Sequence, residues 1–125
     1  MEMNIRITVG STVLTGELND TRTAQAIWDA LPIKTRANTW GKEVYFSIPL
    51  HLDLESGQET VQVGDLGYWP QGNAFCIFFG PTPASKGNEI RPASAVTVFG
   101  KVIGDARALE GMMDGMDVMI GKEHS

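Results

Sequence analysis

The sequence is poor in the residue types that bind metals or form covalent crosslinks. Its 125 residues include one cysteine, Cys76, and two histidines, His51 and His124. A single cysteine excludes an intramolecular disulfide, so the fold must depend on packing, and the expected location is a reducing compartment, the cytoplasm. The shortage of histidine and cysteine ligands argues against a metal site, and we expect no cofactor.

Long apolar runs and concentrated positive charge are also missing. No window approaches the run of about 18 apolar residues that a membrane-spanning helix needs, and the first residues lack the pattern of a secretory signal. The formal charge is −5, and the ten lysines and arginines are scattered along the chain. Because binding to nucleic acid requires a basic patch or stripe, we expect neither nucleic acid nor a membrane among the partners.

The sequence does contain many short segments in which apolar and polar residues alternate. This alternation predicts a pair of strands within each of residues 4–18, 33–52 and 60–69, and single strands within residues 74–79, 94–104 and 115–124. Apolar residues at helical spacing predict one amphipathic helix that Asn19 or Asp20 caps and Pro32 ends, and Asp105 opens a second, short helix. Many strands with one or two helices favour a single mainly β domain over residues 1–125, closed as a barrel.

The richest apolar stretch, GDLGYWPQGNAFCIFFGPTP, covers residues 64–83. Within it, residues 74–79 place apolar side chains on both faces of a strand, which is typical of a strand buried on both sides. Cys76 lies between Phe75 and Ile77, so we interpret it as a structural thiol rather than a nucleophile. Residues 74–79 are therefore predicted to be core.

The first half of the stretch supplies the candidate site. The rings of Tyr45, Tyr68 and Trp69 either close an edge of the core or line a ligand groove, and the sequence leaves both alternatives open. Asp65 either caps a turn or orients a ligand. With Phe46 and Ser47 these residues form the candidate ligand-binding groove, to which we assign no catalytic residue and no metal ligand.

Four segments resemble the cyclophilins, in the same order along the chain. GELNDTRTAQAIWDALP resembles the cyclophilin strand that leads into the first helix. SAVTVFGKVIGDARALEGM resembles the cyclophilin segment in which a strand ending in Val-Phe-Gly-Lys-Val leads into a short helix. GNAFCIFFGPTP resembles the Gly-Ser-Gln-Phe-Phe-Ile strand, and EVYFSIP resembles the Phe-His-Arg strand. The total length and the short loops resemble the compact prokaryotic cyclophilin-like family, minimal barrels whose function is largely unassigned. This resemblance implies a closed eight-stranded barrel with helices over its open ends.

The resemblance transfers the fold better than the activity. Cyclophilin isomerases use a groove arginine that hydrogen-bonds the substrate near the prolyl nitrogen and weakens amide resonance. The resemblance places this arginine near Ser47, and the groove glutamine, phenylalanine and histidine at or near Ala74, Cys76 and Val96. None of the four residue types is matched, although Arg36 or Arg91 could reach the groove from elsewhere.

Two functions from different classes follow from these matches and mismatches. The first is a binding domain that holds a peptide or a small molecule in an aromatic-lined groove without strong catalysis. The alternative is a weak peptidyl-prolyl cis-trans isomerase, so whether the protein is an enzyme stays open. Self-association into a homo-oligomer, which would bury an apolar patch, is a third possibility.

Overall fold

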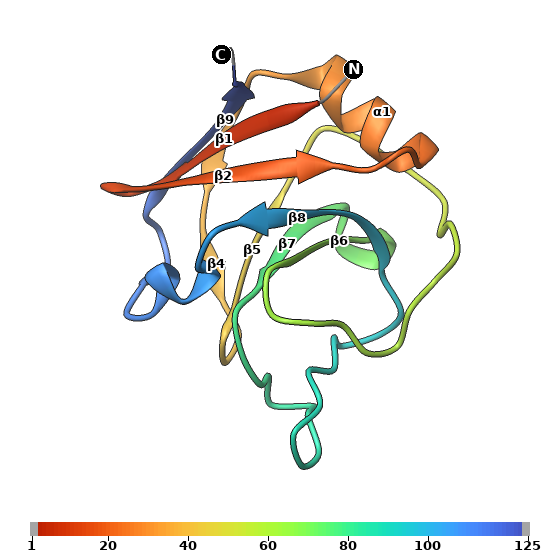
Figure 1. Ribbon diagram of the computed structural model, residues 1–125, viewed down its shortest axis with the longest axis vertical. Coiled ribbons are helices and arrows are strands. Elements are labelled where there is room, and N and C mark those ends of the chain that lie inside the picture. Colours follow the sequence, from red (N-terminus) through yellow and green to blue (C-terminus); the bar gives the residue numbers. More distant parts are fainter. Residues whose placement is uncertain (1–2, 124–125) are drawn as a thin grey trace.

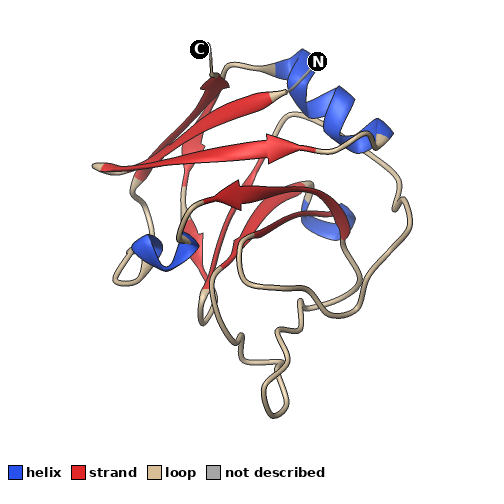
Figure 2. Ribbon diagram, in the orientation of Figure 1, coloured by secondary structure: helices blue, strands red, loops and turns tan. Residues whose placement is uncertain are grey.

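The computed structural model describes residues 3–123, and its main feature is one antiparallel sheet that curls around a core (Figure 1). The sheet has the strand order β3-β9-β1-β2-β8-β6-β7-β5-β4. The strands are β1 (Asn4–Val9), β2 (Thr12–Leu18), β3 (Ile33–Arg36), β4 (Asn38–Thr39), β5 (Glu43–Ser47), β6 (Asp65–Trp69), β7 (Ala74–Phe78), β8 (Thr97–Ile103) and β9 (Asp117–Lys122). Figure 2 shows these strands wrapped around one interior, with the loops at the rims.

The sheet nearly closes at Ala37. The two outermost strands of the order, β3 and β4, are separated in the chain by this one residue. The Ala37 N–H donates to the carbonyl of Met116 at 2.8 Å, and the Gly115 N–H donates to the carbonyl of Ala37 at 2.8 Å. The predicted mainly β barrel is therefore confirmed. It has nine strands rather than the expected eight, because the chain changes partner at Ala37, from β9 before it to β5 after it.

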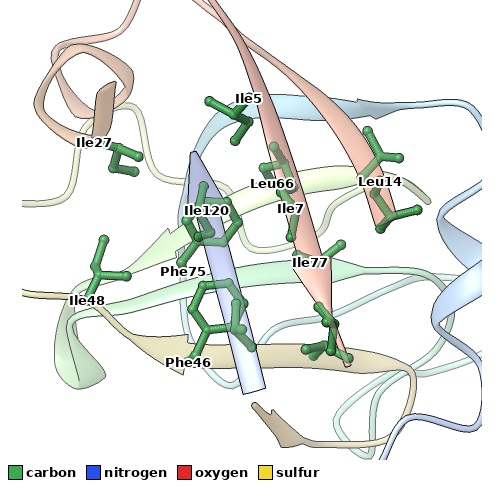
Figure 3. Close-up of a cluster of buried hydrophobic side chains, with 14 of the residues drawn as sticks. Ile5, Ile7, Leu14, Ile27, Phe46, Ile48, Leu66, Phe75, Ile77 and Ile120 are labelled. Atoms are coloured by element: carbon green, nitrogen blue, oxygen red, sulfur yellow. The ribbon is translucent and has the colours of Figure 1, made fainter. Parts of the chain in front are cut away.

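Strand alternation builds the core. In β1, the side chains of Ile5, Ile7 and Val9 are all fully buried, as their spacing predicts. Two aromatic residues from neighbouring strands, Phe46 and Phe75, stack with their ring centroids 4.9 Å apart (Figure 3). Each such side chain stabilises the fold by roughly 1.5–3 kcal/mol relative to an exposed position, so the barrel interior is the main source of stability.

The predicted helix exists, with a different cap. Helix α1 (Arg22–Ala30) begins after Thr21, whose side chain accepts a hydrogen bond from the Ala24 N–H at 3.0 Å. The prediction that Asn19 or Asp20 caps the helix was wrong. The Asn19 carboxamide oxygen instead accepts hydrogen bonds from the backbone N–H and the hydroxyl of Thr21, so it orients the true cap.

A loop carboxylate holds this helix against the long segment between β5 and β6. The Glu55 side chain accepts hydrogen bonds from the backbone N–H groups of Arg22 and Thr23 at 3.1 and 3.0 Å. These donors are the unpaired N–H groups of the first helical turn, and they lower the pKa of Glu55. The segment of residues 50–64 is therefore tied to the helix end.

Two loops cover part of the outer barrel surface. The segment of residues 79–96, drawn at the bottom of Figure 1, pairs with the 50–64 segment through single bridges from Val96 to Gln58 and from Ile90 to Val61. Residues 60–69 therefore contribute one strand, β6, rather than the predicted strand pair. The loops cover outward-facing residues of β7, which confirms that this strand is buried on both faces.

Short 3₁₀ helices follow strands β6 and β8. Helix η1 (Pro70–Gly72) joins β6 to β7, and helix η2 (Ala106–Leu109) follows β8. The Asp105 side chain accepts a hydrogen bond from the Arg107 N–H and caps η2, as its position before the helix predicted. The main helix and the short second helix therefore lie where the sequence predicted them.

Candidate functional site

A cavity that is partly open to solvent lies on the outer face of the barrel, between the sheet and the 79–96 loop. Its volume is about 220 Å³. The strands contribute outward-facing residues of β5, β6 and β7, and the loops contribute the remaining walls. The lining residues are Trp40, Glu43, Tyr45, Trp69, Cys76, Ala93 and Val96.

The register of the sheet explains why these side chains meet. Glu43 and Tyr45 lie two residues apart on β5, so they share a face, and Tyr45 is paired with Cys76 of β7. Trp69 of β6 pairs with Ala74 of β7, two residues before Cys76 on the same face. The indole N–H of Trp69 donates to the Ser94 hydroxyl at 2.6 Å, which fixes the ring against the loop.

Glu43 is the one charged residue in the cavity lining, and its side chain is buried. Its relative exposure is 6%. Desolvation raises the pKa of the Glu43 carboxyl from 4.5 to about 7, and the nearby Cys76 thiol lowers it by a smaller amount. The neighbouring cation, Lys42, pairs with Glu110 at 2.6 Å instead. Within residues 3–123 no salt bridge reaches Glu43.

The lone cysteine lies at the base of the cavity. Cys76 is 1% exposed, and burial, together with the adjacent Glu43 carboxyl, raises the pKa of its thiol well above the usual range. A protonated and inaccessible thiol is a poor nucleophile. The structure therefore places Cys76 as packing at the cavity floor, in agreement with the sequence interpretation.

Two of the predicted groove residues lie in the barrel core instead. Phe46 and Tyr68 are both 0% exposed, and Figure 3 shows the Phe46 ring beside Phe75 inside the barrel. The Tyr68 hydroxyl donates to the Leu50 carbonyl at 2.9 Å and accepts from the Leu52 N–H at 3.1 Å. Their assignment to a groove is corrected, because each is adjacent to a cavity residue and so points to the opposite face of its strand.

The polar members of the predicted groove also lie outside the cavity lining. Asp65 accepts a hydrogen bond from the Gln62 N–H at 2.8 Å, which is the turn-capping alternative, and burial raises the pKa of its carboxyl. Ser47 is exposed, and its hydroxyl donates to the Gly72 carbonyl at 3.3 Å. Of the six candidate residues, the structure brings Tyr45 and Trp69 together in the cavity.

Sequence reasoning missed Trp40, Glu43 and Ala93 as lining residues. Glu43 carried a usable signal, since it stands two positions before Tyr45 in the same predicted strand and therefore shares its face. Trp40 and Ala93 lie outside the strands, where alternation gives no direction. Cys76 and Val96, at or near which the cyclophilin resemblance placed groove residues, do line the cavity.

Neither arginine considered for the groove lines the cavity. The Arg91 guanidinium pairs with Glu89 at 2.6 Å, and Arg36 lies 3.9 Å from Asp117. No arginine or lysine contributes to the cavity wall among the described residues. The cavity thus has an acidic group and aromatic rings, and the cation expected for polarising a prolyl amide is absent from its lining.

The described part of the chain contains neither a metal-binding cluster nor a membrane-spanning helix. Residues 3–123 contain no group of three or more His, Cys, Asp or Glu side chains that could hold a metal ion. His51 hydrogen-bonds Asn73 at 3.1 Å, and His124 lies outside the described residues. Over the same residues, no helix has both the length and the apolar character needed to cross a membrane.

A nearly closed antiparallel barrel with a cavity on its outer face defines the class of domain, and comparisons identify the family. The cyclophilin-like family model matches residues 3–121, so the chain belongs to the cyclophilin-like family. The solution structure of a hypothetical protein from Archaeoglobus fulgidus is similar, with 41% identity, a TM-score of 0.83, and coverage of 98% of this chain and 95% of the other. No curated protein sequence matches the chain significantly.

Proposed function

We propose that this protein binds a small molecule, or one side chain of a peptide, in the aromatic cavity, and that it does so without strong catalysis. The observation that supports this proposal is the cavity itself, in which rings of Trp40, Tyr45 and Trp69 surround a space of about 220 Å³. Ligand pockets are typically apolar and aromatic with few polar groups, and this lining fits that description.

The size of the cavity limits the ligand. Pockets for drug-sized molecules measure roughly 300–1,000 Å³, so this cavity fits one small group rather than a whole ligand of that size. A longer peptide would insert a single side chain and leave its backbone outside. The proposed location remains the cytoplasm, on the sequence argument from the single cysteine.

Weak peptidyl-prolyl isomerase activity is the second candidate, and membership of the cyclophilin-like family favours it. Fold similarity does not imply shared chemistry, which has to come from the site. Rotation about a prolyl bond has a barrier of about 20 kcal/mol, and lowering it requires a donor that polarises the amide. The lining offers the Trp69 N–H, which already donates to Ser94, and no guanidinium.

The tryptophans provide the test. Titration of a library of small aliphatic and aromatic fragments, followed by the indole N–H signals in two-dimensional NMR, should shift Trp40 and Trp69 for at least one fragment. Trp28 serves as the internal control, because it lies on α1 beneath Lys122, away from the cavity. If every fragment leaves the Trp40 and Trp69 signals unmoved, the proposed binding function is wrong.

A matched pair of variants locates the binding. Ala93 lines the cavity, and Ala95 lies two residues further along the same loop without lining it. Ala93→Phe should fill the cavity and abolish the fragment-induced shifts, while Ala95→Phe should leave them. A proline-isomerisation assay at high protein concentration tests the second candidate, and a rate equal to the thermal rate would exclude it.

A further inference from the structure

The cavity contains a buried carboxyl group that forms no salt bridge within the described residues, and this group distinguishes the cavity from a purely apolar pocket. The Glu43 side chain is buried, with a relative exposure of 6%, and no lysine or arginine of the described residues forms a salt bridge with it. No salt bridge or side-chain hydrogen bond reaches the Glu43 carboxyl among the described residues, and the Cys76 thiol, which also lines the cavity, donates to the Ala74 carbonyl. A carboxylate removed from water in this way is costly unless a positive charge accompanies it.

The rings around this carboxyl favour the same type of ligand. Trp40, Tyr45 and Trp69 all line the cavity, and the faces of aromatic rings attract cations, most strongly when the site is desolvated. The one cation–π contact in the described chain joins Lys122 to Trp28, so no protein cation occupies the cavity rings. The rings and the carboxyl group therefore favour a positively charged group in the cavity, and no lysine or arginine among the described residues supplies one.

Other ligand classes fit less well. An anion would meet a carboxyl group and no lysine or arginine in the lining. A metal ion would find one carboxylate and one protonated, buried thiol, and no larger ligand group exists within residues 3–123. A purely apolar ligand would cover Glu43 and leave its carboxyl uncompensated.

We propose that the cavity binds the ammonium group of a small organic amine, with the Glu43 carboxylate as the counter-charge and the rings of Trp40, Tyr45 and Trp69 as the surrounding wall. This inference rests on the proposed binding function and names its ligand class. The amine is either a free small molecule or an amino group at the end of a peptide or side chain. The shared chemistry is one cation on a short apolar body.

The test compares two probes of nearly equal shape and different charge. Titrations with n-butylammonium and with 1-butanol, at about pH 8 so that Glu43 is ionised, follow the Trp69 indole signal. We expect butylammonium to bind on the order of tenfold more tightly than 1-butanol, as one charge interaction of this strength implies. An equal or stronger affinity for 1-butanol overturns the inference and leaves the proposed binding function intact.

Variants assign the effect to Glu43. Glu43→Gln keeps the shape of the side chain and should remove the preference for the ammonium, with binding of 1-butanol unchanged. Glu123→Gln removes the same charge from a residue that pairs with Arg6, and should bind butylammonium as the unmodified protein does. A preference that survives Glu43→Gln overturns the inference. If neither probe binds and the fragment library also fails, both proposals are wrong; if only the fragments bind, the ammonium inference alone is wrong.

An acetylated lysine peptide separates the two sources of the amine. A short peptide with one free lysine should shift Trp69 and lose the effect on acetylation if a peptide amino group is recognised. If butylammonium binds and neither peptide does, the ligand is a free small amine. Both results support an ammonium site and differ in its natural source.

Discussion

At the scale of single residues, the alternation of side chains along a strand decides which groups meet. Tyr45 and Phe46 are neighbours, and so are Tyr68 and Trp69, yet one member of each pair lines the cavity and the other fills the core. Two adjacent strand residues cannot share a groove, because their side chains point to opposite faces. This rule, applied to the sequence, would have separated the two pairs and selected Glu43 with Tyr45.

The raised pKa of Glu43 makes a prediction about stability. The folded protein holds this proton more tightly than the unfolded chain, since the pKa rises from 4.5 to about 7 on folding. The free energy of unfolding should therefore fall as pH rises from about 4.5 to about 7, by at most about 3 kcal/mol, and then level off. Urea unfolding of the protein and of Glu43→Gln across this range measures the difference between them.

The comparison isolates one group. Carboxylates with lowered pKa values, such as Glu55 and Asp114, contribute stability that is lost at lower pH, and they are present in both proteins. Lys42 is held by Glu110, and the Cys76 thiol stays protonated because its pKa is raised. A stability difference that does not change between pH 4.5 and 7 would contradict the assigned burial of the Glu43 carboxyl.

At the scale of elements, close approach of strands restricts one glycine. A Cβ added at Gly100 of β8 would lie 2.5 Å from the Glu17 carbonyl oxygen and 3.1 Å from the Leu18 Cα of β2. Both are backbone atoms of a paired strand, so no side-chain rotation relieves the contact. We predict that Gly100→Ala lowers the free energy of unfolding by about 1–3 kcal/mol, measured by urea denaturation.

Gly121 is the matched control for this prediction. It lies in β9, and a Cβ there meets no heavy atom of the described residues within 4 Å. Gly121→Ala should change the free energy of unfolding by less than about 0.5 kcal/mol. Equal effects of the two substitutions would show that the approach of β8 to β2 does not restrict residue 100.

Most of the strands could be predicted from the sequence, whereas the break between β3 and β4 could not. Alternation located β1, β2, β5, β8 and β9, because half-buried strands impose a period of two on the sequence, and a short run that is apolar on both faces located β7. The break at Ala37 has no local signal, since it depends on hydrogen bonds to Met116 and Gly115 far along the chain. The cavity walls at Trp40 and Ala93 lie outside strands, so their positions follow from tertiary packing.

At the scale of the whole molecule, the last strand joins the barrel. β9 pairs with β1 on one side and with β3 on the other, so it connects the first strand of the chain to the segment that closes the sheet. Its Val118 and Ile120 are buried in the core. Such pairing between distant parts of the sequence forms late and slowly, because a long loop must close first.

Removal of β9 should therefore prevent folding altogether. A chain that ends at residue 116 loses two buried side chains, each contributing roughly 1.5–3 kcal/mol, and exposes the edges of β1 and β3. Domains are stable by about 5–15 kcal/mol in total, so these losses, together with the missing ladder hydrogen bonds, remove most of that stability. Near-ultraviolet circular dichroism and thermal unfolding should show no cooperative transition.

Deletion of residues 86–88 in the exposed outer loop is the control and should leave the transition in place, since surface loop tips tolerate such changes. A truncated chain that still unfolds cooperatively would mean that the barrel does not depend on closure through β9.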